Sequence, residues 1–136
     1  MDILQPPGWP RPLGYANGVA ARGRLIFTAG IVGRDPNGPF PPDFVGQASW
    51  ALTNILAVLA EAGAGAEHLV RLTWYIRDRR EYLANQSELG DVYREVFGRH
   101  FPAMTMVEVA ALIDDEARLE IEATAVVPDE DEDEEA

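Results

Sequence analysis

The segment 118–127 constrains the fold more than any other part of the chain, because apolar and polar residues alternate along it. In a β-strand, alternation separates the side chains onto two faces. The apolar face carries Leu119, Ile121, Ala123 and Ala125, and the polar face carries Glu120, Glu122 and Thr124. This pattern predicts a sheet with one face covered by helices and the other face open.

A second alternating segment, residues 104–112, precedes the first one and is joined to it by Asp114-Asp115-Glu116. The spacing predicts an antiparallel hairpin, Met104 to Val127, with Glu108, Glu120 and Glu122 on one face. A turn near Asp115 places Glu108 close to Glu122, and such a pair of like charges requires water, an arginine from elsewhere, or a raised pKa of one carboxyl group. A solvated polar face explains the pattern, and so does a subunit interface at which Glu120 handles protons.

The remaining elements complete the order ββαβαββ, an α/β (α+β) fold. Helical spacing begins after Asp43, a good N-cap, and stops at Gly63. A β-branched and aromatic run predicts a strand over 69–76, and a second helix is expected from about Arg80 to Phe97. The first hairpin is predicted around Arg22-Gly23. Because two helices cover only one face of such a sheet, the other face needs a partner or stays wet, which favours an oligomer.

Charge and composition divide the chain into three parts. We expect an irregular, proline-rich arm over 1–13, one domain over 14–128, and a disordered acidic tail over 129–136. The net charge is −12, but seven acids lie within 129–135, which leaves 16 acidic against 11 basic residues elsewhere. This balance disfavours nucleic-acid binding.

The absence of two residue types excludes several kinds of chemistry. The chain has no cysteine, which excludes disulfides, thiolate nucleophiles and cysteine-held metal sites. All 11 basic residues are arginine, so a catalytic lysine, a lysine-held cofactor and a P-loop lysine are excluded as well. No signal peptide and no membrane-spanning run is visible, so a cytoplasmic protein without membrane contact is expected.

Several ordered segments together resemble the Rid (YjgF/YER057c) family of reactive-intermediate deaminases. They are Gly14–Val19, Leu25–Gly30, Ala51–Ile55, Val70–Tyr75, Phe101–Thr105, Val107–Ala110 and Glu120–Ala123. The resemblance implies a chorismate-mutase-like fold, and a homotrimer with small-molecule sites in the clefts between subunits. It also implies hydrolysis of enamines and imines to a carbonyl compound and ammonia, without a metal or an organic cofactor.

The resemblance also assigns candidate residues. The family's site tyrosine matches Tyr15, and the carboxylate thought to position the attacking water matches Glu120. The family serine of a Ser-Gly pair is Ala29 here, before Gly30, and an asparagine on the second helix falls at Gly90. Backbone groups near Thr105 would polarise the C=N carbon.

The position of the substrate-binding arginine is the main departure from the family. Met104 occupies the position of the arginine in the family's Pro-Ala-Arg motif. Met106 occupies the position two residues later, which is often cysteine in the family. A thioether cannot replace a bidentate arginine–carboxylate contact. Either the substrate is less anionic than a small 2-imino acid, or another cation has taken over, and the candidates are Arg34, Arg77, Arg79, Arg80, Arg99 and His100.

Two further interpretations stay open at this point. With Tyr15, Trp74 or Phe101, the methionines would line an apolar pocket for a bulkier or aromatic enamine or imine, or they would pack an interface instead. The enzyme hypothesis competes with a catalytically silent trimeric module that binds small molecules or acts like a chaperone. Ribonuclease activity, ascribed to some relatives, is disfavoured by the acidic body and by the lack of paired histidines.

Overall fold

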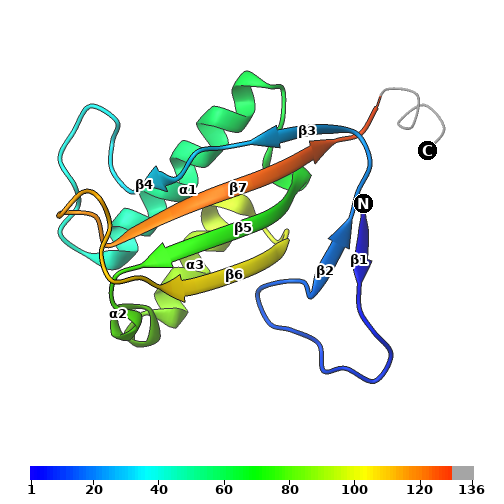
Figure 1. Ribbon diagram of the computed structural model, residues 1–136, viewed down its shortest axis with the longest axis horizontal. Helices are drawn as coiled ribbons and strands as arrows, with labels where there is room; N and C mark the ends of the chain where they lie inside the picture. Colours follow the sequence, from blue (N-terminus) through cyan, green and yellow to red (C-terminus); the bar gives the residue numbers. More distant parts are fainter. Residues whose placement is uncertain (130–136) are drawn as a thin grey trace.

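The computed structural model describes residues 1–129 and contains one main sheet, a separate two-stranded ribbon, and helices on one side of the main sheet (Figure 1). The expected acidic tail, apart from Asp129, lies outside the described residues. In chain order the elements are β1 (Asp2–Leu4), β2 (Gly18–Ala20), β3 (Arg24–Phe27), β4 (Ile31–Val32), α1 (Phe44–Glu61), β5 (Leu69–Ile76), α2 (Arg79–Ala84), α3 (Gln86–Phe97), β6 (Ala103–Glu108) and β7 (Leu119–Val127).

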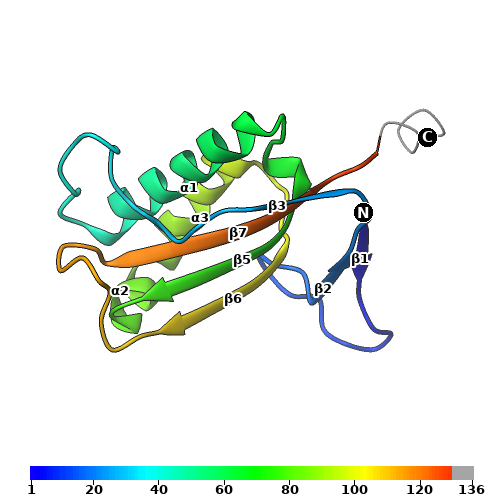
Figure 2. The same ribbon diagram turned by 45° about the horizontal axis from the view of Figure 1, so that its top comes forward.

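The main sheet has the strand order β3-β7-β5-β6, and β4 also pairs with β7. β7 runs antiparallel to β3, β4 and β5, whereas β6 runs parallel to β5. Helices α1 and α3 lie together on one side of this sheet (Figure 2). The predicted fold class, one sheet covered on one face by helices, is therefore confirmed.

Helix α1 begins and ends where the sequence predicted. The Asp43 carboxylate accepts a hydrogen bond from the Gly46 N–H, and the chain leaves the helix through Gly63 at φ 71°. The inner stripe of α1 is fully buried against the sheet: Ala48, Ala51, Leu52, Ile55 and Leu59. The burial of this stripe fixes α1 on the sheet.

The second predicted helix is two helices. The chain breaks at Asn85, where the side-chain Nδ2 donates to the Glu81 carbonyl at 2.7 Å. Asparagine competes for backbone partners in this way and favours helix ends. The inner stripe of α3 contains the expected residues, with Leu89, Tyr93 and Phe97 all buried.

The predicted hairpin Met104 to Val127 is wrong. β6 and β7 are not paired with each other, because β5 lies between them: Thr73 faces Thr105 on one side and Glu122 on the other. β6 also stops at Glu108, so the predicted strand to Leu112 is too long. Alternation reports that each strand lies in a sheet, but it does not say which strand is the neighbour.

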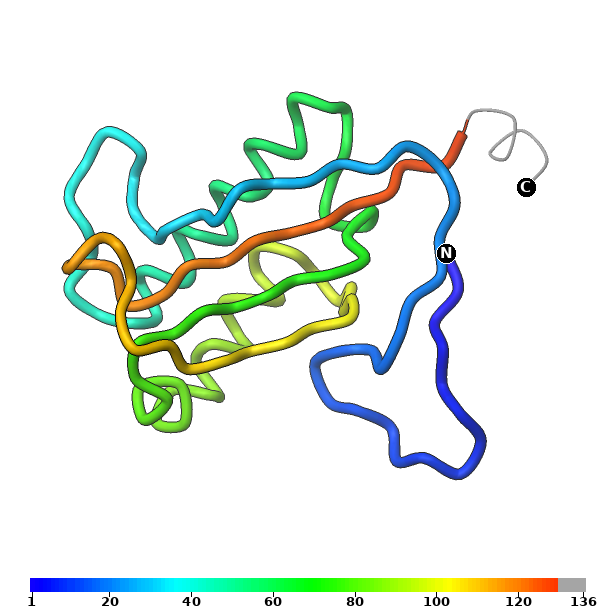
Figure 3. The backbone as a smooth tube through the Cα atoms, viewed as in Figure 1, coloured from blue at the N-terminus to red at the C-terminus, as the bar shows by residue number. Residues whose placement is uncertain are grey.

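The predicted N-terminal hairpin is also wrong. β2 pairs with β1 in a separate ribbon, with Ile3 opposite Val19, and β3 pairs with β7. At Gly23, φ is 148° and an added Cβ would lie 2.0 Å from the Val127 carbonyl oxygen, so glycine is required where the chain crosses from the ribbon to the main sheet (Figure 3). The arm 1–13 is therefore not irregular throughout, since it contains β1.

The two faces of the main sheet differ as predicted for β7. On the covered face, Trp74 stands beside Ile121 and both are buried. On the other face, here called the open face, Tyr75 stands beside Glu120, and no helix covers them among the described residues. Leu25, Phe27 and Val107 are exposed large apolar side chains of the sheet. Exposed apolar groups on a sheet are typical of an interaction surface.

Candidate functional site

The sequence-derived site residues form two groups on opposite faces of the sheet. Met104 and Met106 stand in register with Leu72 and Trp74 and pack against the core on the helix side. Glu120 is the register partner of Tyr75 and Val32 and lies on the open face. The sheet itself separates Met104 from Glu120, so one copy of the chain cannot place both against the same small molecule.

The first group lines an open cavity of about 520 Å³ between the end of the N-terminal arm, α3 and β6. We call it the methionine cavity; its lining includes Tyr15, Trp74, Tyr82, Leu89, Gly90, Tyr93, Arg94, Phe101, Met104 and Met106. The structure thus brings together six of the sequence-predicted residues: Tyr15, Trp74, Gly90, Phe101, Met104 and Met106. Its walls are mainly aromatic rings and thioethers, which suits an apolar or aromatic ligand group.

Tyr93 and Phe101 build the aromatic wall of the cavity. Their rings stack with centroids 5.3 Å apart, and the Tyr93 hydroxyl donates to the His100 carbonyl at 2.7 Å. Burial raises the pKa of Tyr93 well above its usual value. Tyr93 is therefore a neutral structural support.

The second group, here called the glutamate site, consists of Ala29, Gly30 and Glu120. A Cβ added to Gly30 would lie 2.0 Å from the Glu120 Oε1, so only glycine leaves room for this carboxylate. Thr28, which the sequence analysis missed, fastens the loop to β7. Its N–H donates to the Ala123 carbonyl at 2.9 Å, and its hydroxyl oxygen accepts from the Ala123 N–H at 3.0 Å.

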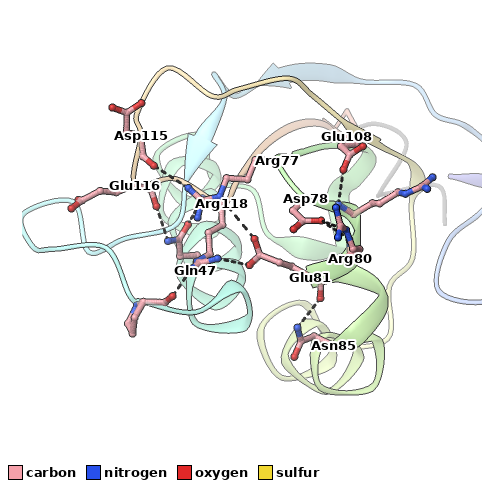
Figure 4. A network of polar contacts seen from close by, with 12 residues as sticks. Gln47, Arg77, Asp78, Arg80, Glu81, Asn85, Glu108, Asp115, Glu116 and Arg118 are labelled. Atoms are coloured by element: carbon pink, nitrogen blue, oxygen red, sulfur yellow. Dashed lines mark hydrogen bonds and ion pairs between the residues drawn. The ribbon is translucent and has the colours of Figure 1, made fainter.

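The predicted neighbours of Glu120 are rearranged. Glu122 accepts a hydrogen bond from the Tyr75 hydroxyl at 2.7 Å on the open face. Glu108 is not close to Glu122: it stands in register with Ile76, and its Oε1 accepts from the Arg79 N–H at the start of α2, at 3.0 Å (Figure 4). The expectation of three acids on one face is wrong, because it required β6 and β7 to be neighbours.

Thr105 and His100 lie outside both groups. Thr105 is exposed and points away from Met104 and Met106, since successive residues of a strand face opposite sides. His100 places its Nε2 2.7 Å from the Leu69 carbonyl oxygen and borders a separate cavity that also contains Arg11 and Arg99. A ring nitrogen held by a backbone carbonyl favours a structural role for His100.

The basic residue at the methionine cavity is Arg94, which was absent from the sequence-derived candidates. Arg34 stacks on Phe40, and Arg77 donates to the Asp115 carbonyl at 2.9 Å. Arg79 and Arg80 begin α2, and neither lines the methionine cavity. Helical spacing could have identified Arg94 from the sequence, because Gly90 was a predicted site residue and positions 90 and 94 share one helix face.

Tyr75 provides a test of the open-face electrostatics. Its hydrogen bond to Glu122, followed by burial and the charges of Glu122 and Glu120, raises its pKa above the usual value of about 10. Because the pKa is raised in the folded chain, stabilisation by neutral Tyr75 is present below pH about 10 and is lost as the pH rises through the raised pKa.

We expect Glu122→Gln to lower the pKa of Tyr75 toward its usual value, because the charged acceptor is removed. Tyrosine ¹³Cζ chemical shifts followed against pH report this pKa, and Tyr75→Phe assigns the signal. A Tyr75 pKa that is the same in Glu122→Gln and in the unchanged chain would contradict this electrostatic account.

Within residues 1–129, no cluster of three or more His, Cys, Asp or Glu side chains suitable for a metal ion is present. No helix in the described part of the chain is both long and apolar enough to cross a membrane.

Comparison with known proteins identifies the family. The model of the family described as Endoribonuclease L-PSP matches residues 10–127. A RutC family protein of Synechocystis sp. is 35% identical over 134 residues, covering 94% of this chain and 98% of the relative. TdcF of Escherichia coli, which is named as a reactive intermediate deaminase, is 32% identical over 130 residues, covering 93% and 95%.

Solved structures agree with this result. A Rid family protein, YyfB from Yersinia pestis, superposes with a TM-score of 0.81 at 29% identity, covering 93% of this chain and 98% of that one. Escherichia coli TdcF, solved with bound serine, superposes with a TM-score of 0.66 at 32% identity, covering 93% and 99%. On the full-length match and the shared fold, this chain belongs to the Endoribonuclease L-PSP family, which includes the YjgF and Rid proteins.

Proposed function

We propose that this chain is a homotrimeric deaminase that hydrolyses a reactive enamine or imine to a carbonyl compound and ammonia. Its active site combines the methionine cavity of one subunit with the glutamate site of its neighbour. The observation that carries the proposal is the position of Tyr15 and Glu120 on opposite sides of one sheet. Packing the open face of one subunit against the cavity side of another unites them, and the exposed Leu25, Phe27 and Val107 support such an interface.

The proposed reaction needs only water and proton transfer. An enamine first tautomerises to the imine, and Glu120 then takes a proton from water while the oxygen bonds to the C=N carbon. Glu120 returns this proton to the nitrogen, which gives the carbinolamine. The hydroxyl proton of the carbinolamine then moves through Glu120 to the amino group, the C–N bond breaks, and ammonia leaves as the C=O bond forms. Tyr15, at the cavity mouth and 43% exposed, orients the substrate, and Glu120 acts as the general base.

The substrate differs from a small 2-imino acid. The cavity lies within the size range of drug-sized ligand pockets, and Met104 and Met106 make its floor apolar. These features favour an enamine or imine with a bulky apolar or aromatic side chain. The relative TdcF is named as a reactive intermediate deaminase, which supports the reaction class.

Ammonia release from freshly generated imines tests the proposal. We expect the chain to accelerate release from an aromatic imine over the uncatalysed rate, and sedimentation to give a mass of three chains. Because Met104 replaces the family arginine, a silent binding module is the second candidate. Specific ligand binding without acceleration on any imine would favour that module.

Displacing Glu120 without changing its charge gives a sharper test. We expect Gly30→Ala to lower kcat about 100-fold, since the new Cβ would overlap Oε1 and a displacement of about 1 Å has this effect in other enzymes. Stability should change little, because the displaced atoms end a flexible side chain. Steady-state ammonia assays measure kcat, and Gly38→Ala, whose Cβ would meet Asp35 at 3.1 Å, is the matched control. Full activity in Gly30→Ala would remove Glu120 from the mechanism.

A further inference from the structure

One residue that lines the methionine cavity carries a hydrogen-bond donor without an acceptor in the described part of the chain. Trp74 lines this cavity and is 2% exposed, and its Nε1–H finds no acceptor among the described residues. Buried polar groups nearly always have a partner, and an exception needs an explanation. Two tyrosine hydroxyls of the same wall have partners: Tyr93 donates to the His100 carbonyl, and Tyr82 accepts from the Gln86 amide nitrogen at 3.4 Å. The Trp74 Nε1 atom is itself buried, so recognition of a polar ligand group depends on other residues of the cavity wall.

Arg94 supplies a positive charge to the same cavity. It stands one turn after Gly90 on α3, and its Nη1 would lie 3.3 Å from a Cβ placed on Gly90. Because Gly90 has no side chain, nothing on that turn keeps the guanidinium away from the helix surface. Glycine inside a helix is destabilising relative to alanine, so leaving room for the guanidinium beside Gly90 lowers the stability of α3.

The guanidinium of Arg94 retains free binding capacity. Its Nη2 donates to the Asp91 Oδ1 at 2.6 Å, but a guanidinium carries five N–H donors. The Asp91 side chain is 73% exposed and that of Arg94 43% exposed, so the pair is well solvated and contributes little. The guanidinium of Arg94 can therefore direct its remaining N–H donors at a ligand carboxylate, for which its planar geometry is suited.

We infer that Arg94 holds the carboxylate of the substrate in place of the arginine missing at Met104, so that the substrate is a carboxylated enamine or imine with an aromatic side chain. The inference rests on the proposed function and names its substrate class. The carboxylate lies at the rim, beside Arg94. The aromatic group lies on Met104 and Met106.

Binding of two matched unreactive probes tests this inference without turnover. 3-Phenylpyruvate carries a carboxylate, and 3-phenylpyruvamide is the same molecule with a neutral amide. Isothermal titration gives Kd for each. We expect Arg94→Gln to weaken phenylpyruvate about tenfold to hundredfold, as for loss of a hydrogen bond to a charged group, and to leave the amide unchanged.

Two further variants test whether the effect on phenylpyruvate binding is specific to Arg94. Asp91→Asn removes the competing carboxylate and is expected to tighten phenylpyruvate binding about two- to fivefold. Arg80→Gln is the matched control, because Arg80 is 89% exposed, lies outside the cavity and contacts Asp78. It should bind both probes like the unchanged chain, and thermal unfolding followed by circular dichroism checks that each variant is folded.

The outcomes separate this inference from the proposed function. Equal Kd values for phenylpyruvate in Arg94→Gln and the unchanged chain overturn the role of Arg94, as does a lack of binding by either probe, even when imine hydrolysis is intact. Selective loss of phenylpyruvate binding in Arg94→Gln supports it, even when no imine is turned over. In that case the deaminase proposal fails and Arg94 remains the carboxylate-binding residue of a binding module.

Discussion

Replacing Glu120 with glutamine is expected to lower kcat for imine hydrolysis by about 100- to 10,000-fold, the usual contribution of a positioned general base. Glutamine keeps the size of the side chain and its place beside Gly30, but it cannot accept the proton of the attacking water. Binding of an unreactive ligand should change little, because Glu120 acts on water. Steady-state ammonia release measures kcat, and equilibrium titration measures binding.

The matched control for this variant is Glu95→Gln on the exposed surface of α3. It removes the same charge from the chain at a distance from the glutamate site, so activity should be kept. If Glu120→Gln and Glu95→Gln were equally active, the general-base role would be untenable.

Mixing two inactive variants tests whether the site is shared. Tyr15→Ala damages the methionine cavity, and Glu120→Gln damages the glutamate site on the other side of the sheet. When the two are unfolded together and refolded in equal amounts, about a quarter of the sites combine an intact cavity with an intact Glu120 from a neighbour. Recovery of about that fraction of activity indicates a site between subunits, whereas no recovery indicates that each subunit acts alone.

The largest stability effect is expected from Gln47→Ala. Gln47 is 1% exposed and connects three segments (Figure 4). Its Nε2 donates to the carbonyls of Pro41 and Glu116, both at 3.0 Å, and its Oε1 accepts from the Arg118 N–H at 2.7 Å. Alanine leaves these backbone groups without a partner and opens a void. Each buried group left unpaired costs ~1–3 kcal/mol, so we expect the free energy of unfolding to fall by about 3–5 kcal/mol.

Urea unfolding at fixed protein concentration measures this change, with an unchanged m-value indicating the same native surface. Gln86→Ala is the control, because Gln86 is exposed and its amide nitrogen lies 3.4 Å from the Tyr82 hydroxyl. A surface change of this kind stays within about 0.5 kcal/mol. If the free energy of unfolding fell no more in Gln47→Ala than in Gln86→Ala, the loops would not depend on the side-chain amide of Gln47.

Gln47 also illustrates what the sequence concealed. It is a polar residue among apolar ones on α1, and its partners lie 6, 69 and 71 residues away. Local periodicity predicted the helix correctly, because Asp43, Gly63 and the apolar stripe act within a few turns. The same periodicity could not identify the loops that Gln47 holds, because those contacts exist only after the chain has folded.

Arg94 was missed for a related reason. The cations predicted from the sequence were assigned to loops and strand ends, whereas the basic residue that lines the methionine cavity lies on α3, one turn from Gly90. Trp74 was expected to line a pocket, but the missing acceptor for its Nε1–H is a property of the packed core.

The sequence alone determined the strand over 119–127, its apolar and acidic faces, helix α1 and the family to which the chain belongs. These features depend on local spacing or on ordered motifs, which the chain carries before it folds. The tertiary structure decided which strands are neighbours, because β5 separates β6 from β7 and this pairing is between distant segments. That single arrangement moved Glu108 away from Glu122 and placed Met104 and Glu120 on opposite sides of the sheet.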